Sequence, residues 1–490
     1  MEYEPVIGLE VHAELATESK MFCACRVVDS TQAPPNTAVC PVCSGMPGVL
    51  PVVNYKAVEM GLRVALALEC EVQPFSLFAR KNYFYPDLPK GYQISQYEYP
   101  LARYGKLTIP TSQGERTIRI RRVHLEEDTG KLTHVNQDGV SFSLVDLNRA
   151  GVPLLEIVTE PDMFTIEEAR AYAYELRAIL RYLGVNSGDL EKGIIRFEAN
   201  VSVRPRGSQQ LGTRTEIKNL NSFRAMERAV SYEIQRQISL LERGESVLQE
   251  TVGWNEATGE TYSQRGKEDA HDYRYFPEPD LPPLVIEPGW IDTLKQKLPE
   301  LPRAKAHRFQ LIYRITESEA NLLVEDAAIA SYFEKCAWLL KYAPPRSVAH
   351  WILGEYFAWL RQEGIGIEKI KVSPAALAEL LDLLAKGKIN QLTAKTVLTE
   401  MLQTGRPPAD IISERGLEQV SDVDSINSTV DAVLAAHPAE VTSYLAGKET
   451  LSNWFFGQVM RLMQGKANPQ IVQSVLQSRL SSLKEKNLPS

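Results

Sequence analysis

Strict alternation of apolar and polar residues in the N-terminal part of this 490-residue chain constrains its fold more than any other feature. In segment 7–15, every second side chain is apolar, and the residues between are Gly8, Glu10, His12 and Glu14. Segment 195–204 repeats the pattern, and segment 118–128 follows it if it is extended. A period of two is typical of a β-strand with one buried face. These segments therefore predict an N-terminal domain built mainly on a sheet.

The polar sides of these strands carry an unusual mixture of carboxylates, imidazoles and guanidinium groups. They hold Glu10 with His12; Arg122, His124, Glu126 and Asp128; Arg196, Glu198 and Arg204; and Glu216 with Lys218. One interpretation is an ordinary solvated face. The other is a site for a divalent cation, which carboxylates and a histidine suit, and for phosphates, which arginines and lysines suit. Composition alone leaves both interpretations open.

The pattern changes twice along the chain. A length of 490 residues exceeds what one hydrophobic core accommodates, so several domains are expected. A proline-rich stretch at 277–289 ends the strand-rich part, the pattern is helical from about 293, and Pro407-Pro408 marks a second break. The predicted fold class is α+β, with a mainly antiparallel-sheet domain that has a charged face (1–292), an all-helical domain (293–408) and a small helical tail domain (409–490).

Local capping signals predict where individual helices begin and end. Within the strand-rich part, one helix is expected from the capping box of Thr165 and Glu168 to Gly184, and another over about 222–243, before Gly244. In the helical part, Ser373-Pro374 predicts an N-cap followed by proline at the first helical position, and Thr393 is the predicted cap of the next helix.

Four of the six cysteines cluster as Cys23, Cys25, Cys40 and Cys43. In a reducing compartment such spacing favours a metal over disulfides, and the Cys40-Pro41-Val42-Cys43 half is typical of a zinc knuckle. A structural zinc is the prediction, with unliganded cysteines as the alternative. Cys70 and Cys336 lie in apolar stretches and are expected in the core.

Several classes of protein are excluded or disfavoured. The net charge of −8 argues against a wholly basic nucleic-acid coat, and no apolar run approaches the roughly 20 residues that span a bilayer. The start of the chain does not resemble a secretory signal, so a soluble, cytoplasmic protein is expected. There is no Walker A sequence, no Gly-x-Gly-x-x-Gly after a strand, no Gly-x-Ser-x-Gly and no His-Glu-x-x-His. ATP, if bound, would therefore bind on a sheet through metal and arginines.

Long motifs resemble the B-subunit family of the aspartyl/glutamyl-tRNA amidotransferases. The most specific is Val145-Asp146-Leu147-Asn148-Arg149-Ala150-Gly151-Val152-Pro153-Leu154-Leu155-Glu156-Ile157-Val158. Segments 6–12, 80–87, 91–96, 124–128 and 272–277 agree as well, and segments 454–460 and 465–469 look like the family's C-terminal domain. The chain lacks the long insertion of the archaeal E-type relative.

The resemblance implies a function and a set of partners. In this family the protein uses ATP and Mg²⁺ to phosphorylate the side-chain carboxylate of Glu on tRNA(Gln) or Asp on tRNA(Asn), and ammonia then displaces the phosphate. The resemblance allows Glu-tRNA(Gln), Asp-tRNA(Asn) or both as substrates. The ammonia comes from an amidase A subunit, and a small C subunit completes the complex. Residues 1–292 would form the kinase and amidation cradle, and the tail would bind tRNA.

The resemblance also assigns roles to individual residues. The implied Mg²⁺ ligands are Glu10, His12, Glu126 and Glu127, with Asp128 as the alternative to Glu127. The implied catalytic residues are Glu126, Arg196, Glu198 and Lys218. The implied nucleotide or acceptor-end contacts are Arg80, Lys81, Tyr83, Asn148 and Arg149. Asn148 and Arg149 have a structural alternative, since they could simply hold the turn at Gly151-Val152-Pro153.

Two segments suggest nucleic-acid contact but have ordinary alternatives. Segment 80–96 interleaves basic and aromatic side chains, which suits an unpaired RNA end or an aromatic-packed loop. Segment 446–490 has six basic and two acidic residues, a net charge of +4, and includes Lys448, Arg461 and Lys466. It suits tRNA phosphates or a solvated helical end. A free-standing carboxylate–amine ligase and a non-catalytic tRNA-binding protein remain the competing functions.

Overall fold

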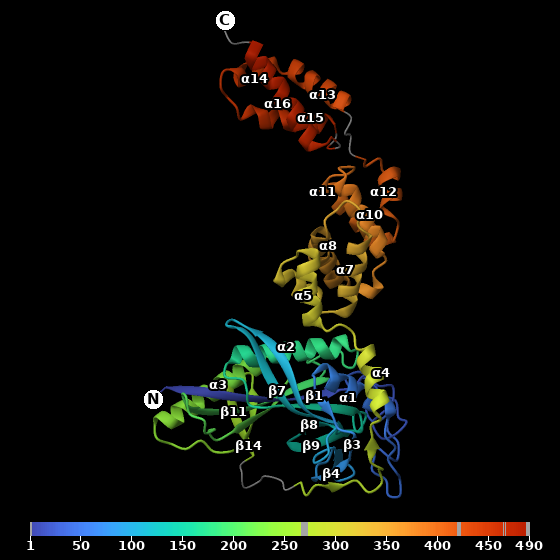
Figure 1. Ribbon diagram of the computed structural model, residues 1–490, viewed down its shortest axis with the longest axis vertical. Coiled ribbons are helices and arrows are strands. Elements are labelled where there is room, and N and C mark those ends of the chain that lie inside the picture. Colours follow the sequence, from blue (N-terminus) through green and yellow to red (C-terminus); the bar gives the residue numbers. More distant parts are fainter. Residues whose placement is uncertain (1, 266–272, 419–422, 464, 466, 487–490) are drawn as a thin grey trace. The chain divides into compact units, whose positions relative to one another are not determined.

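The computed structural model describes residues 2–265, 273–418, 423–463, 465 and 467–486. The chain divides into two compact units, Met1–Leu301 and Pro302–Ser490 (Figure 1). The predicted sheet-to-helix boundary at 292 falls within α4 (Pro288–Lys297), whose Leu294 packs in the core of the first unit. None of the helices in the described ranges is long and apolar enough to cross a membrane.

A nine-stranded sheet forms the centre of the first unit. Its order is β14 (Glu260–Arg265), β13 (Thr251–Asn255), β12 (Thr215–Leu220), β11 (Ile195–Pro205), β1 (Tyr3–Glu14), β10 (Pro153–Thr159), β7 (Gly114–Glu127), β6 (Ala102–Thr111) and β2 (Glu71–Val72). Every neighbouring pair is antiparallel except β12 with β13, which is parallel. The three segments predicted from alternation are β1, β11 and the end of β7, which confirms the mainly antiparallel α+β class.

Helices cover the apolar face of this sheet. They are α1 (Tyr55–Ala67), α2 (Ile166–Tyr182) and α3 (Phe223–Glu242), and Figure 1 shows α2 and α3 lying along the sheet. Leu9 and Val11 of β1 and Phe197 of β11 are fully buried in the core that these helices share with the sheet. Because alternate residues of a strand point to opposite faces, this packing leaves the polar sides of β1, β7 and β11 on the other face.

The predicted helix ends of the first unit are confirmed. The Thr165 side chain accepts the Glu168 backbone N–H, and the Glu168 side chain reaches back in a complete capping box. Gly184 follows α2 with a left-handed φ of 63°. Ser222 caps α3 by accepting the Ala225 backbone N–H. The cap residues were recognisable because their hydrogen bonds span only three positions.

Three smaller sheets complete the first unit. One contains β15 (Phe276–Pro277), β4 (Ala79–Asn82) and β5 (Tyr92–Ser95), and it brings segment 80–96 against the end of β7. A second pairs β16 (Leu284–Val285) with β3 (Phe75–Ser76). The third is a hairpin of β8 (Lys131–Gln137) and β9 (Val140–Asp146). Along the chain, Asp128 of the charged face comes just before this hairpin and Arg149 comes just after it.

The second unit is helical in all of its described elements. The elements up to residue 414 are α5 (Pro302–Tyr313), α6 (Glu317–Leu323), α7 (Ala327–Leu339), α8 (Pro345–Trp351), the π-helix η2 (Ile352–Tyr356), α9 (Phe357–Glu363), the 3-10 helix η3 (Ile367–Lys369), α10 (Pro374–Ala385), α11 (Gln391–Thr404) and α12 (Pro408–Glu414). Ser373 caps α10 as predicted. The prediction for Thr393 is wrong, because Asn390 caps α11 and accepts the Thr393 backbone N–H.

The last four helices have a core of their own. They are α13 (Val423–Ala436), α14 (Pro438–Leu445), α15 (Leu451–Leu462) and α16 (Pro469–Lys486). Phe455 and Val459 of α15 are fully buried in that core. The predicted tail begins at 409, but α12 packs with α10 and α11, so this helix belongs with the elements before it.

Candidate active site

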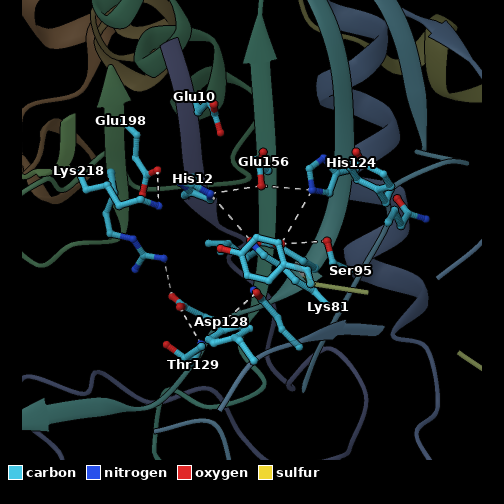
Figure 2. A pocket seen from close by; sticks show the side chains of 18 of the residues that line it. Glu10, His12, Lys81, Ser95, His124, Asp128, Thr129, Glu156, Glu198 and Lys218 are labelled. Carbon is cyan, nitrogen blue, oxygen red and sulfur yellow. Dashed lines mark hydrogen bonds and ion pairs between the residues drawn. The ribbon is translucent and has the colours of Figure 1, made fainter. Parts of the chain in front are cut away.

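A row of four polar side chains crosses the centre of the charged face. The strand register aligns Arg196 of β11 with His12 of β1, His12 with Glu156 of β10, and Glu156 with His124 of β7. Residues directly opposite each other on antiparallel strands have neighbouring side chains on one face. The register therefore brings together four residues that are far apart in the sequence. Figure 2 labels three of them, His12, Glu156 and His124.

Glu156 is the centre of this row. Its Oε2 lies 3.3 Å from His12 Nε2 and 3.3 Å from His124 Nε2. Glu126 lies two residues after His124 on β7, on the same face. Its Oε1 is 4.0 Å from His12 Nε2, and its carboxylate accepts a hydrogen bond from the Ser95 hydroxyl at 3.0 Å. Glu126, Glu156 and His124 are each at most 5% exposed. Two carboxylates and two imidazoles thus meet almost out of contact with solvent.

The electrostatics of this group keep the carboxylates anionic. Burial alone would raise the pKa of Glu156, but His124 and His12 hold it well below its usual range. Burial likewise opposes ionisation of Glu126, yet His124 and Lys81 lower its pKa. For His12, burial would lower the pKa, but the hydrogen bond and charge of Glu156 outweigh it and raise the pKa to about 9. The two carboxylates therefore stay ionised because His12, His124 and Lys81 balance their charge.

A second acidic group lies beside the first. The Glu10, Glu198 and Glu216 carboxylates each offer an oxygen within 4.8 Å of the others, as the ligand atoms of His12, Glu126 and Glu156 do in the first group. Asn200 donates to Glu10 at 2.7 Å, and Lys218 Nζ lies 3.2 Å from Glu198 and 3.4 Å from Glu216. Burial, followed by repulsion from Glu156 and Glu198, raises the pKa of Glu10.

Cations surround both groups. Arg196 Nη2 lies 2.8 Å from Asp128 Oδ2, and Arg149 Nε lies 3.6 Å from the same oxygen. These two arginines overcome the effect of burial and lower the pKa of Asp128 to about 2. The Lys81 ammonium lies 5.1 Å from the ring centre of Tyr273, and the pKa of Lys81 is raised by Glu126 and Tyr275 against the effect of burial.

All of these groups line one cavity of about 510 Å³. Its walls come from the charged face, from β4 and β5, and from Tyr273 and Tyr275. The predicted site residues that line it are Glu10, His12, Lys81, Tyr83, Glu126, Arg149, Arg196, Glu198 and Lys218. The solvated-face interpretation does not fit this enclosure, since several of the charges are buried and paired.

Three predicted residues lie elsewhere. The Glu127 carboxylate accepts the Ile94 backbone N–H at 2.9 Å and contacts Lys90, because adjacent residues of a strand point to opposite faces. For the same reason Arg80 does not follow Lys81 into the cavity but forms a bidentate pair with Glu278, at 2.7 Å for each bond. Asn148 is fully buried and bridges two backbone groups, the Ala38 N–H and the Pro34 carbonyl, both at 2.8 Å.

Sequence reasoning gave the wrong weight to three cavity residues. The sequence identifies Glu156 only as a member of the family motif, although it is the residue that joins His12 to His124. Its strand, β10, is buried at every position, so it shows no alternation that would mark one face as polar. The sequence pattern puts His124 and Glu216 on the charged face but assigns neither to a site. Strand register is the information that was missing for all three.

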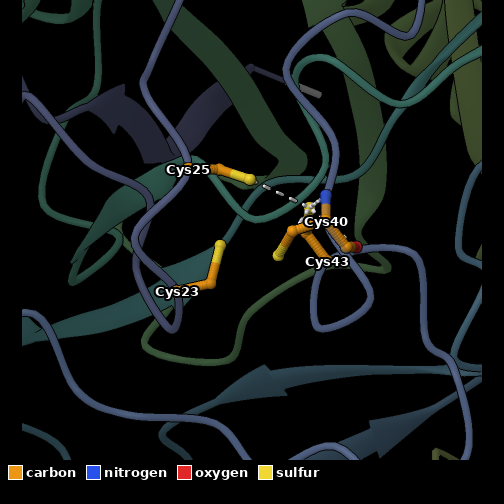
Figure 3. A group of neighbouring side chains, drawn as sticks. All are labelled: Cys23, Cys25, Cys40 and Cys43. Carbon is orange, nitrogen blue, oxygen red and sulfur yellow. Dashed lines mark hydrogen bonds between the residues drawn. The ribbon is translucent and has the colours of Figure 1, made fainter.

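The four clustered cysteines converge as predicted (Figure 3). Their sulfur atoms all lie within 4.8 Å of one another, and Cys43 Sγ is 3.8 Å from Cys40 Sγ and 4.0 Å from Cys25 Sγ. The Cys40 backbone N–H donates to Cys43 Sγ at 3.2 Å. The group can hold a metal ion such as zinc. Cys70 and Cys336 are buried in apolar cores, as expected.

Two of the three basic residues named in the predicted tail lie on the surface. Lys448 and Arg461 are exposed, whereas Lys466 lies outside the described residues. Part of the positive charge is paired, because Arg479 contacts Asp431 at 2.9 Å and Lys484 contacts Glu449 at 2.9 Å.

Comparison with known proteins assigns the family. The "GatB/GatE catalytic domain" family model matches residues 5–292, and the "GatB domain" model matches residues 331–480. The B subunit of the aspartyl/glutamyl-tRNA(Asn/Gln) amidotransferase of Thermodesulfovibrio yellowstonii is 52% identical over 478 residues, which cover 97% of this chain and 99% of that protein. The chain belongs to this B-subunit family. Its likeness to the B subunit of Myxococcus xanthus is similar, with 50% identity over 479 residues, 98% of this chain and 99% of that protein.

The B subunit of Moorella thermoacetica is 51% identical over 480 residues, which span 98% of this chain and the whole of that protein. Relatives of this family thus match the sheet unit and the helical unit together. The resemblance inferred from the motifs is confirmed. The word "subunit" in the names of these relatives describes them as parts of a larger amidotransferase.

Proposed function

We propose that this chain activates the side-chain carboxylate of Glu or Asp carried by a misacylated tRNA, at the expense of ATP, and converts it to the amide. One carboxylate oxygen attacks the γ-phosphorus of ATP, and ADP leaves. Ammonia then attacks the carbonyl carbon of the acyl phosphate. The bond from that carbon to the phosphate oxygen breaks, and inorganic phosphate leaves with this oxygen and one proton from the ammonia. The acyl phosphate provides the leaving group that a free carboxylate lacks.

The observation that carries this proposal is the single cavity in which two anionic ligand groups lie among buried cations. Phosphoryl transfer needs little covalent chemistry from the protein and depends on positioning and charge stabilisation. Lys81, Arg149 and Arg196 line the cavity, and their charge would stabilise the negative charge that develops on the transferred phosphoryl group. The Tyr273 and Tyr275 rings help to enclose this part of the cavity, which limits the access of water to the acyl phosphate.

The donor sets fit divalent cations. Glu10, Glu198 and Glu216 offer only oxygen ligands, which Mg²⁺ prefers. His12 with Glu126 and Glu156 would add an imidazole that Mn²⁺ also accepts, and because only a neutral imidazole binds a metal, the cation would have to displace the His12 proton. The lowered pKa values of Glu126 and Glu156 keep these ligands ionised at neutral pH. A bound Mg²⁺ would neutralise charge on the phosphates of ATP and orient them.

The cysteine group fits structural zinc. Four thiolates around one Zn²⁺ form a closed tetrahedral site with no position left for substrate. We assign to this metal the role of holding segment 23–43 in its fold, with no part in the chemistry.

Two kinds of partner complete the proposal. An amidase A subunit would release ammonia from glutamine, and a small C subunit would join the two larger chains. The misacylated tRNA would place its acceptor end in the cavity while Lys448 and Arg461 contact phosphates of its body. The names of the relatives support the amidotransferase complex and the tRNA substrate.

The decisive experiment measures ATP cleavage by the reconstituted complex with Glu-tRNA(Gln), with Asp-tRNA(Asn), with the uncharged tRNAs, and with free glutamate plus ammonia. We expect ADP and phosphate only with a misacylated tRNA. Turnover on free glutamate would instead indicate a small-molecule ligase. No ATP cleavage under any condition would leave a tRNA-binding protein and refute the proposal.

A further inference from the structure

Lys20 is a lysine side chain that is completely buried. Along the chain it follows β1 and precedes Cys23, and 0% of its surface is exposed. Its ammonium donates to the Ala38 carbonyl at 2.8 Å and to the Leu147 carbonyl at 3.2 Å, and it lies 3.6 Å from Cys43 Sγ. No carboxylate in the described part of the chain forms an ion pair with Lys20.

This environment satisfies the hydrogen bonds of the ammonium without balancing its charge. Two of its three N–H groups donate to carbonyl oxygens, and the third donates to the sulfur of Cys43. A buried charge without a counter-charge is strongly unfavourable. Four thiolates around Zn²⁺ carry a net charge of −2 and would supply that negative charge beside Lys20.

Lys20 also contacts the segment that carries Arg149. Segment 145–151 is hydrogen-bonded to the loop between Cys25 and Cys40. Asn36 of that loop donates to the Val145 carbonyl at 2.9 Å and accepts the Leu147 backbone N–H at 2.8 Å. Gly151 has a left-handed φ of 84°, and its carbonyl accepts the backbone N–H of Met21, the neighbour of Lys20, at 2.7 Å. The same segment places Arg149 in the active-site cavity.

We propose that Lys20 is the counter-charge of the cysteine metal centre and couples that centre to segment 145–151. Metal binding keeps the Lys20 ammonium between Cys43 and the Leu147 carbonyl. The hydrogen bond from Lys20 to that carbonyl then fixes the backbone that places Arg149 in the cavity. Loss of the metal would remove the negative charge, displace Lys20 and loosen segment 145–151. The inference rests on the zinc site proposed above and makes Lys20 a positioning residue.

The first test compares zinc retention in three variants of the full chain. Lys20→Met removes charge and hydrogen bonds, Lys20→Gln keeps a hydrogen-bond donor without the charge, and Lys56→Met is the control because Lys56 is exposed and pairs with Glu59. Zinc affinity is measured by competition with a chromogenic chelator. We expect both Lys20 variants to bind zinc about 10- to 100-fold more weakly, in the range for loss of a group that contacts metal ligands, and the control to be unchanged.

The second test follows segment 145–151 directly by amide hydrogen exchange. In the wild-type chain, chelation of zinc should speed exchange in this segment, and in zinc-loaded Lys20→Gln the exchange should already be fast. Unchanged zinc affinity in Lys20→Gln, or unchanged exchange after the metal has been removed, would overturn the role of Lys20. If the wild-type chain binds no zinc at all, the proposed metal site itself fails, and the coupling fails with it.

Discussion

Replacing Glu156 by glutamine keeps the size of the side chain and removes one negative charge between two imidazoles. The carboxylate lies 3.3 Å from both His12 and His124. An ion pair at that distance is worth about 5 kcal/mol at an effective dielectric constant near 20. The amide of the introduced glutamine cannot supply that interaction, and it offers a cation one neutral oxygen in place of an anionic ligand.

The expected loss of activity is smaller than the Coulomb figure, because water and neighbouring carboxylates compensate in part. Removing one preorganised electrostatic group from an active site typically costs about 10²- to 10³-fold in rate, or about 2.7–4 kcal/mol. We expect Glu156→Gln to lose that much tRNA-dependent ATP cleavage. We also expect a higher Mg²⁺ concentration for half-maximal activity, while the partner's glutaminase remains competent.

The matched control is Glu160→Gln. Glu160 follows the same strand but pairs with Arg121 near the surface, at 2.8 Å, outside the cavity. Both variants would be reconstituted with the partner subunits and assayed for ADP release at several Mg²⁺ concentrations, with misacylated tRNA held constant. Glu160→Gln should match the wild type.

A second measurement tests the electrostatic reasoning without turnover. Glu156 is the main group that raises the pKa of His12 to about 9 against the effect of burial. In metal-free protein, Glu156→Gln should therefore lower the His12 pKa, as followed by NMR of labelled histidine. Near-normal ATP cleavage together with an unchanged His12 pKa would refute the central role given to Glu156.

Three further predictions concern other parts of the chain. Changing Cys40 and Cys43 to serine should remove about one equivalent of zinc by elemental analysis and lower the Tm, and a metal-free wild-type chain of full stability would contradict this. A chain cut after Gly416, which keeps α12 in place, should show a higher KM for misacylated tRNA with a flatter salt dependence, and unchanged tRNA affinity at every salt concentration would exclude a tail role. Burial, followed by the charge of Asp128, raises the pKa of Glu14 from 4.5 to about 8, so the protonated form stabilises the fold fully below pH 4.5 and this contribution is lost as pH rises towards 8. Glu14→Gln should reduce the fall of Tm over that interval, and an identical pH profile would show that Glu14 does not titrate there.

Local patterns in the sequence were sufficient for most of the architecture. The alternation in segments 7–15 and 195–204 identified β1 and β11, and Thr165 and Ser222 marked the starts of α2 and α3. These signals work because the hydrogen bonds and faces involved depend on residues two to four positions apart. The failure at Thr393 has the same origin, since Asn390 is an equally good cap three positions earlier.

The resemblance to a family supplied what local patterns could not. Motifs such as segment 145–158 pointed to amidotransferase B subunits, and the similarity to relatives over nearly the whole chain confirms that assignment. The motif did not reveal that its members serve different purposes. Glu156 joins the central histidine group, Arg149 lines the cavity, and Asn148 is a buried link to the cysteine loop.

The sequence by itself determined which residues share a face of each strand, because successive side chains alternate across a strand regardless of its neighbours. It therefore placed Glu10 and His12 together, and it could have separated Glu126 from Glu127. Only the tertiary structure decided which faces meet. Register depends on pairing between segments that are far apart in the chain, and it alone brought Glu156 between His12 and His124. Those pairings, together with burial, turned a charged face into a cavity that can bind cations and phosphates.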